Sequence, residues 1–208
     1  MKNIPSIKLS VQHLETAGYT TLLHFVVLAL YYLLGFDEEQ SSTVAAWCFR
    51  LLAAGLLAYP LIVLYHLLHQ LGSWTGSASV FILLALGTAL VVLMTDTNLF
   101  SPNIKLGLNL ALGILYCYVV VRIFTTGFAP IAKATALQCY LFVAGVYGAT
   151  QILYSLAGPS RADSAAADWV FGMVEAVLYF TQIWIFLHLA KYYTRNRPPW
   201  AQPVTATP

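Results

Sequence analysis

Charged residues are scarce in this chain of 208 residues, where they make up 9% of the total, against roughly 25% in ordinary soluble domains. Hydrophobic residues make up 60%, which is more than one soluble core of this size can bury, so lipid must cover much of the surface. The net charge of +2 provides no basic patch or stripe, and we therefore expect no nucleic-acid partner.

Motifs for chemistry are also missing. The three cysteines form no Cys-x-x-Cys pair. The sequence has no Walker-type loop, no His-Glu-x-x-His, no Gly-x-Ser-x-Gly and no dinucleotide-binding glycine fingerprint. We therefore expect a protein that is not an enzyme and that holds no cofactor.

Long apolar stretches account for most of the chain. Each is near or above the ~20 residues that a helix needs to cross a bilayer. They cover residues 19–36, 43–71, 77–95, 104–124, 131–157 and 169–192. Lipid offers no partner for free backbone groups, so these stretches must be helical, and short connections make successive helices antiparallel neighbours. The sequence predicts an all-α polytopic membrane protein with a bundle of six transmembrane helices.

We expect three regions along the chain. The transmembrane domain covers residues 19–193. Residues 1–18 precede it, either as an amphipathic helix at the membrane interface or as a frayed terminus. Residues 194–208 are rich in proline and show no periodicity, which is typical of a disordered tail.

Lysine and arginine placement predicts the orientation, because basic residues concentrate on the cytoplasmic side. An inward N-terminus puts seven basic residues inside: Lys2, Lys8, Arg122, Lys133, Lys191, Arg195 and Arg197. It leaves three outside: Arg50, Lys105 and Arg161. Both termini are therefore predicted to be cytoplasmic. The small size and the lack of Asn-x-Ser/Thr acceptors favour a bacterial inner membrane.

Arg50 and Glu175 are charged residues inside the predicted spans, at similar depth in the outer leaflet. A charge in lipid is costly, so the two are expected to pair, or Arg50 extends to the outer headgroups. Tyr179 and Gln182 follow Glu175 on one helical face. This stripe predicts an intramembrane polar site for protons or a substrate, or a hydrogen-bonded carboxyl that holds helices together.

Histidines offer a second candidate site. Four of them lie in the predicted inner leaflet: His24, His66, His69 and His188. Histidines from neighbouring helices can ligate a b-type haem or another metal, although they also serve as neutral hydrogen-bonding residues near an interface. If Arg50 and Glu175 face each other, His66 points about 160° away from Arg50 and His188 about 140° away from Glu175, so the two candidate sites compete. His69, at about 100° from Arg50, conflicts less.

Small residues mark one face of the fifth predicted helix. Ala144, Gly145 and Gly148 would let another helix approach closely, either within the bundle or in an oligomer. The lack of a catalytic motif, the short loops and the single clear buried acid make our first hypothesis an assembly, accessory or scaffold subunit that packs against other membrane subunits or itself. The alternatives are a small-molecule or proton-coupled transporter or channel centred on Glu175, and a haem-binding redox membrane protein.

Overall fold

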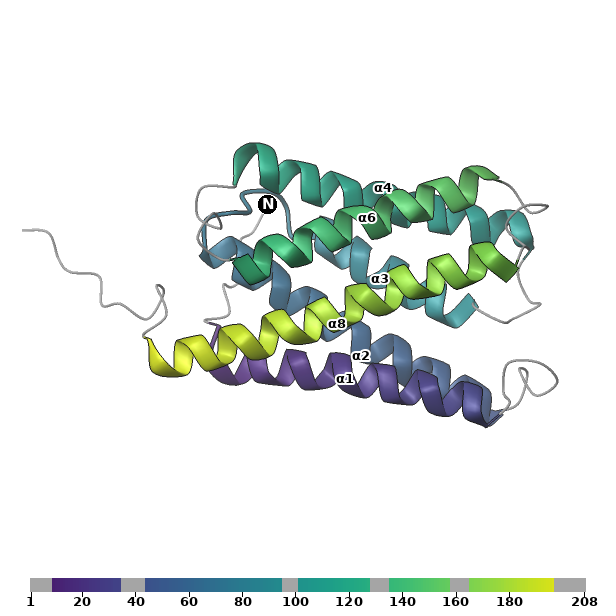
Figure 1. Cartoon of the computed structure of the whole chain (residues 1–208), viewed down its shortest axis with the longest axis horizontal. Coiled ribbons are helices and arrows are strands. Elements are labelled where there is room, and N and C mark those ends of the chain that lie inside the picture. Colours follow the sequence, from purple (N-terminus) through teal and green to yellow (C-terminus); the bar gives the residue numbers. More distant parts are fainter. Residues whose placement is uncertain (1–8, 35–43, 95–100, 128–134, 158–164, 197–208) are drawn as a thin grey trace, which may run out of the picture.

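The computed structural model describes residues 9–34, 44–94, 101–127, 135–157 and 165–196. All regular structure in these residues is helical, and it forms six helices (Figure 1). They are α1 (Val11–Leu33), α2 (Val44–Gln70), α3 (Ser79–Met94), α4 (Pro102–Thr126), α6 (Thr135–Ala157) and α8 (Ala165–Arg195). The predictions for residues 1–8 and 197–208 lie outside the described residues.

Five of these helices are long and apolar enough to cross a membrane: α1, α2, α4, α6 and α8. The remaining helix, α3, is apolar but has 16 residues, which gives about 24 Å at a rise of about 1.5 Å per residue. The prediction of an all-α polytopic membrane protein is confirmed, and the chain is an integral membrane protein.

The ends of α1 and α8 differ from the predicted boundaries. Ser10 caps α1 by accepting a hydrogen bond from the backbone N–H of His13, whose ring accepts one from Ser10 in return. This capping box starts the helix at Val11, so residues 11–18 continue the first span and form no separate segment. The last helix likewise extends to Arg195, into the region predicted as a tail.

The six helices form a closed ring. Each packs mainly against its neighbours along the chain, and α8 packs back against α1. Figure 1 shows that α1 begins and α8 ends at the same end of the bundle. Side chains from every helix fill the space inside the ring, where they form the buried core. A polar group that points into this space is surrounded by several helices.

Two glycines bring α4 and α6 into close contact. A Cβ added at Gly148 would lie 2.9 Å from the carbonyl oxygen of Gly113, and one added at Gly113 would lie 2.7 Å from that of Gly148. Real Cβ atoms essentially never approach other atoms this closely. The two backbones therefore cross here because neither residue has a side chain.

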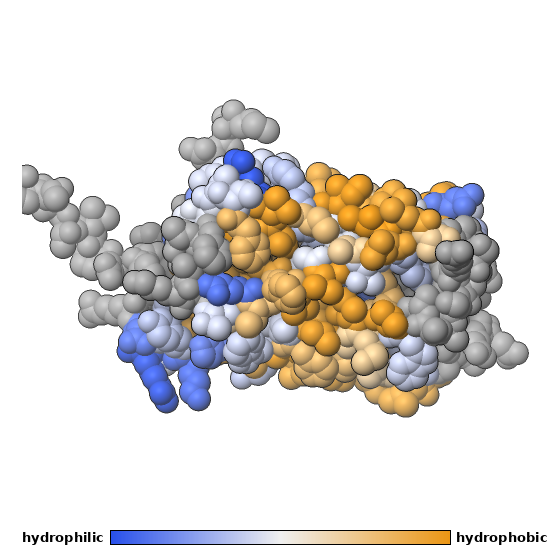
Figure 2. Space-filling model, turned by 45° about the horizontal axis from the view of Figure 1, so that its top comes forward, coloured by the Kyte–Doolittle hydropathy of each residue, from blue (hydrophilic) through white to orange (hydrophobic). Residues whose placement is uncertain are grey.

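The outer surface of the ring is apolar. Leucine, isoleucine, valine and phenylalanine side chains are exposed on all six helices, and Phe142 on α6 is 68% exposed. Figure 2 shows hydrophobic residues over much of the bundle and strongly hydrophilic ones gathered at the end where α8 finishes. This distribution suits a surface whose middle faces lipid and whose ends face headgroups and water.

The connection from α2 to α3 packs against the end of α4. Gly72 ends α2 with a positive φ of 71°, which suits glycine. The backbone N–H groups of Ser73 and Trp74 then donate to the carbonyl of Leu68, at 2.9 and 3.1 Å. A Cβ at Gly127 would overlap the carbonyl of Ser73, so this connection has no room for a larger residue at that position.

Candidate functional site

Glu175 lies on α8, where its carboxylate accepts a hydrogen bond of 2.8 Å from the hydroxyl of Tyr179. The two residues are one helical turn apart, which places them on the same face. Glu175 is partly buried and Tyr179 is buried. Within the described part of the chain, no basic side chain forms an ion pair with this carboxylate.

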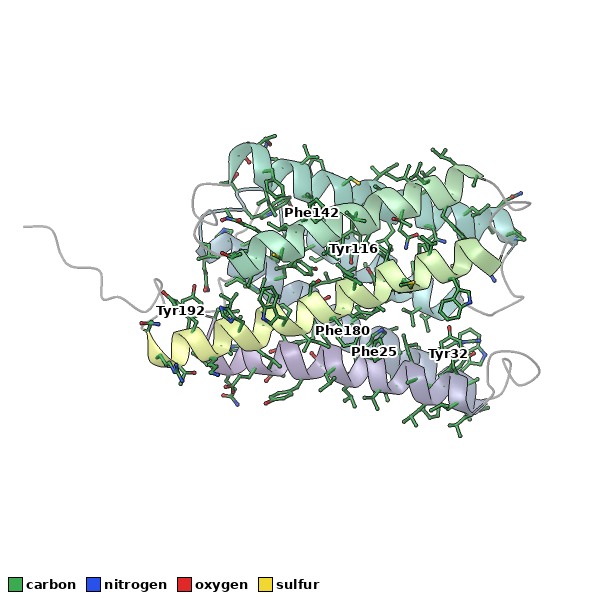
Figure 3. All side chains as sticks on the ribbon, viewed as in Figure 1. Phe25, Tyr32, Tyr116, Phe142, Phe180 and Tyr192 are labelled. Carbon is green, nitrogen blue, oxygen red and sulfur yellow. The ribbon has the colours of Figure 1, made fainter. Side chains whose placement is uncertain are left out.

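Other helices bring polar groups to the same region. Tyr116 of α4 and Tyr147 of α6 lie near Glu175. Their rings pack edge to face at 5.1 Å, and Figure 3 shows Tyr116 in the space inside the ring. Gln151 donates to the hydroxyl of Tyr147 at 2.7 Å, and Thr88 of α3 lies near Tyr116. A polar cluster from four helices therefore surrounds the carboxyl.

His24 of α1 extends this cluster to a fifth helix. Its ring is 0% exposed and packs edge to face on Tyr179 at 5.0 Å. Its Nδ1 lies 2.9 Å from the carbonyl oxygen of Ala53. A carbonyl only accepts hydrogen bonds, so we assign the ring proton to Nδ1. The neutral ring then keeps a lone pair on Nε2, which has no hydrogen-bond partner among the described residues.

Of the five other buried polar atoms without a hydrogen-bond partner among the described residues, two belong to glutamines of α6 and α8. They are Oε1 of Gln151 and Nε2 of Gln182, and their residues are 0% and 3% exposed. A buried polar atom without a partner costs about 1–3 kcal/mol, and native structures rarely leave one so. Together with His24, these atoms favour a bound water or polar solute inside the ring.

Arg50 does not pair with Glu175, contrary to our first expectation. α1 lies between α2 and α8 in the ring, so the two side chains come from helices that are not neighbours. Arg50 instead donates to the hydroxyl of Tyr31 on α1. Its guanidinium carbon lies 5.2 and 5.5 Å from the ring centroids of Tyr31 and Trp47.

The alternative prediction for Arg50 is also wrong, because a side chain that is 3% exposed does not extend to the headgroups. Burial between two aromatic rings, with a hydroxyl as acceptor, stabilises the cation inside the protein. Arg50 is therefore buried apart from Glu175. Of the four residues predicted for that site, Glu175, Tyr179 and Gln182 lie along α8, and Arg50 does not join them.

The four histidines lie in different surroundings. His24 is near the middle of α1, deeper than the inner leaflet we predicted, because that helix begins at Val11. His66 is buried against Tyr65, whereas His69 is exposed, and exposed His188 packs on Trp184. Among the described residues, no three His, Cys, Asp or Glu side chains form a group that could hold a metal ion.

The small residues of α6 face α4. Gly148 contacts Gly113, a Cβ at Gly145 would lie 3.3 Å from Val120, and Ala144 is 3% exposed. The face that we considered for an oligomer is therefore occupied inside the ring.

Sequence reasoning missed several members of the cluster: Thr88, Tyr116, Tyr147 and Gln151. The spacing of Tyr147 and Gln151, four residues apart on the face that carries Ala144 and Gly148, was the available signal.

Comparison with protein-family models, curated proteins and solved structures finds no match to this chain.

Proposed function

We propose that this protein is a proton-coupled transporter of a small polar solute, with Glu175 as the proton-binding group. The proposal depends on one observation: a carboxyl inside a membrane bundle with no basic partner in the described chain. An ionised carboxylate in such a place costs several kcal/mol. A proton bound to the carboxyl, or a positively charged group of a solute beside it, lowers that cost. If the proton and the solute occupy the site in turn, their movements across the membrane are coupled.

The burial of α8 supports access to this carboxyl. Its interior face is partly exposed at Phe171, Val174 and Glu175, and it becomes buried one turn further along, at Leu178 and Tyr179. The packing around α8 is therefore looser at the turn of Glu175 than at the next turn. A binding group beside a closed segment is what alternating access requires, since the solute must not pass freely.

Polar groups beyond Tyr179 support a route deeper into the bundle. His24 packs on the Tyr179 ring, and Gln182 follows one turn along α8. Nε2 of His24 and Nε2 of Gln182 have no hydrogen-bond partner among the described residues. The first can accept a hydrogen bond from a solute, and the second can donate one. These groups continue the polar interior past the closed segment.

Reconstitution into liposomes that contain a pH-sensitive dye tests this function. Mixtures of amino acids, polyols and short amines are added outside, and solute-dependent proton movement is recorded. We expect Glu175→Gln to abolish the proton movement, because the amide has nearly the same shape but does not ionise. Glu175→Asp keeps a carboxyl and should retain part of it.

Tyrosine variants provide a matched comparison. Tyr179→Phe removes the hydrogen bond to Glu175 and should lower the rate, whereas Tyr192→Phe changes an exposed hydroxyl and should leave it unchanged. The proposal fails if wild-type protein moves no protons beyond empty vesicles with any mixture. It also fails if Glu175→Gln matches wild type with a solute that is transported.

The other two hypotheses stay predictions. An assembly or scaffold role was favoured by the small residues of α6, and these pack inside the ring. Haem binding needs two histidines that converge, and the contacts of the described residues instead join His24 to Ala53 and Tyr179, and His188 to Trp184. Neither hypothesis has a specific structural observation in its favour.

A further inference from the structure

A groove of about 330 Å³ opens between the start of α1 and the end of α8, which is within the range of small-molecule sites, about 300–1,000 Å³. The two helices pack closely just beside it, since a Cβ at Gly18 would lie 2.8 Å from Leu187. Leu187 also lines the groove. This groove is on the outer surface of the ring, away from the Glu175 cluster.

The polar lining comes from both helices. Lys191 and Arg195 are four residues apart on α8, and Glu15 and Tyr19 are four apart on α1, so each pair shares a helical face. All four side chains are exposed. Glu15 makes no ion pair or hydrogen bond with Lys191, with Arg195 or with any other described residue. Two cations and one anion are thus available for a ligand.

Thr194 adds a further acceptor. Its hydroxyl donates to the carbonyl of Ala190 at 2.8 Å. The single proton is therefore used, and the hydroxyl oxygen keeps lone pairs that accept hydrogen bonds. The groove combines donors, on Lys191 and Arg195, with acceptors, on Glu15 and Thr194.

We propose that this groove binds the headgroup of a membrane phospholipid with a phosphate and a primary ammonium, that is, a phosphatidylethanolamine. The phosphate lies against Lys191 and Arg195, which supply charged N–H donors. The ammonium lies against Glu15 and Thr194, and its three N–H groups match these two acceptors. Leu187 and Ala190 provide an apolar floor for the glycerol and the first acyl carbons.

The position of the groove favours a lipid over a soluble molecule. It lies at one end of the apolar belt, beside Tyr192 and Tyr193, and aromatic side chains of this kind collect at the membrane interface. Choline lipids carry no N–H donor, and phosphatidylglycerol leaves Glu15 without a counter-charge. The charge pattern therefore selects the ethanolamine headgroup over both.

Native mass spectrometry of the full chain tests this. The protein is released from nanodiscs with equal amounts of phosphatidylethanolamine, phosphatidylcholine and phosphatidylglycerol, and the retained lipids are counted. We expect wild type to retain phosphatidylethanolamine over the other two. Glu15→Gln should lower the ratio of ethanolamine to choline lipid by about two- to fivefold, the range for an exposed charge pair. The double variant Lys191→Gln, Arg195→Gln should retain less of all three lipids.

The control is Arg122→Gln, which removes an exposed base on α4 outside this groove and should leave retention unchanged. Equal retention of the three lipids by wild type overturns the proposal, as does an unchanged ratio in Glu15→Gln. If the double variant does not fold, Lys191→Gln alone carries the same expectation. None of these results depends on proton transport.

Discussion

Replacing Gly148 by alanine should destabilise the bundle, because the new methyl group has no space at the crossing of α4 and α6. It would lie 2.9 Å from the carbonyl oxygen of Gly113, 2.9 Å from Cβ of Tyr116 and 3.0 Å from the sulfur of Cys117. Ordinary contacts of this kind begin at 3.4 Å. The helices must therefore separate by about 0.5 Å, the difference between 3.4 and 2.9 Å.

The expected loss follows from two opposing effects. Overpacking of a well-packed site costs about 1–3 kcal/mol. Alanine is more favourable than glycine inside a helix by about 0.5–1 kcal/mol. The two ranges subtract to a net loss of about 0–2.5 kcal/mol, with a midpoint of about 1 kcal/mol, which lowers Tm by about 2–4 °C for a chain of this size. Gly148→Leu adds a larger side chain at the same contact and should lower Tm further.

Thermal unfolding in detergent measures this effect, and Gly55→Ala is the matched control. A Cβ at Gly55 meets nothing within 4 Å, so that variant should keep or raise Tm. Size-exclusion chromatography separates this reasoning from an oligomer face, where Gly148→Leu would dissociate copies without changing the fold. A Tm for Gly148→Ala equal to that of Gly55→Ala would refute the close crossing.

Two further predictions concern buried contacts. Tyr31→Phe removes a hydroxyl that accepts a hydrogen bond from buried Arg50, and it should lower the free energy of unfolding by about 1–2 kcal/mol. Tyr192→Phe changes an exposed hydroxyl and should cost almost nothing. Equal Tm values for the two variants would contradict this prediction. Gly127→Ala places a methyl group onto the carbonyl of Ser73 and should lower the free energy of unfolding by at least about 3 kcal/mol. The yield of folded protein and its Tm should both fall strongly. A yield and a Tm equal to those of wild type would show that the connection from α2 to α3 adjusts freely.

The helices were largely predictable because each one had to be apolar over a membrane thickness. The second predicted span, residues 43–71, differs by one residue at each end from α2. Boundaries shifted most in α1, where hydropathy gave little sign that residues 11–18 continue the helix. The capping box of Ser10 and His13 depends on a histidine in place of the usual Glu or Gln, which made the start hard to recognise.

The candidate site was predictable only in part. Glu175, Tyr179 and Gln182 were visible as a polar stripe because they share one helix face. The expected pairing with Arg50 was wrong because it assumed that α2 and α8 are neighbours, whereas α1 lies between them. Partners from other helices, such as Tyr116 and His24, could not be assigned without the order of helices around the ring.

The sequence by itself determined the solvent and the secondary structure of this protein, because a chain with so little charge must sit in lipid and lipid requires helices. The tertiary structure decided which side of each helix faces inward. For most residues, side-chain polarity does not indicate which side of a helix faces inward, because lipid and the protein core are both apolar. It depends on contacts such as Gly148 with Gly113 and Arg50 with Tyr31, and the closure of α8 onto α1 then places His24 beside Tyr179.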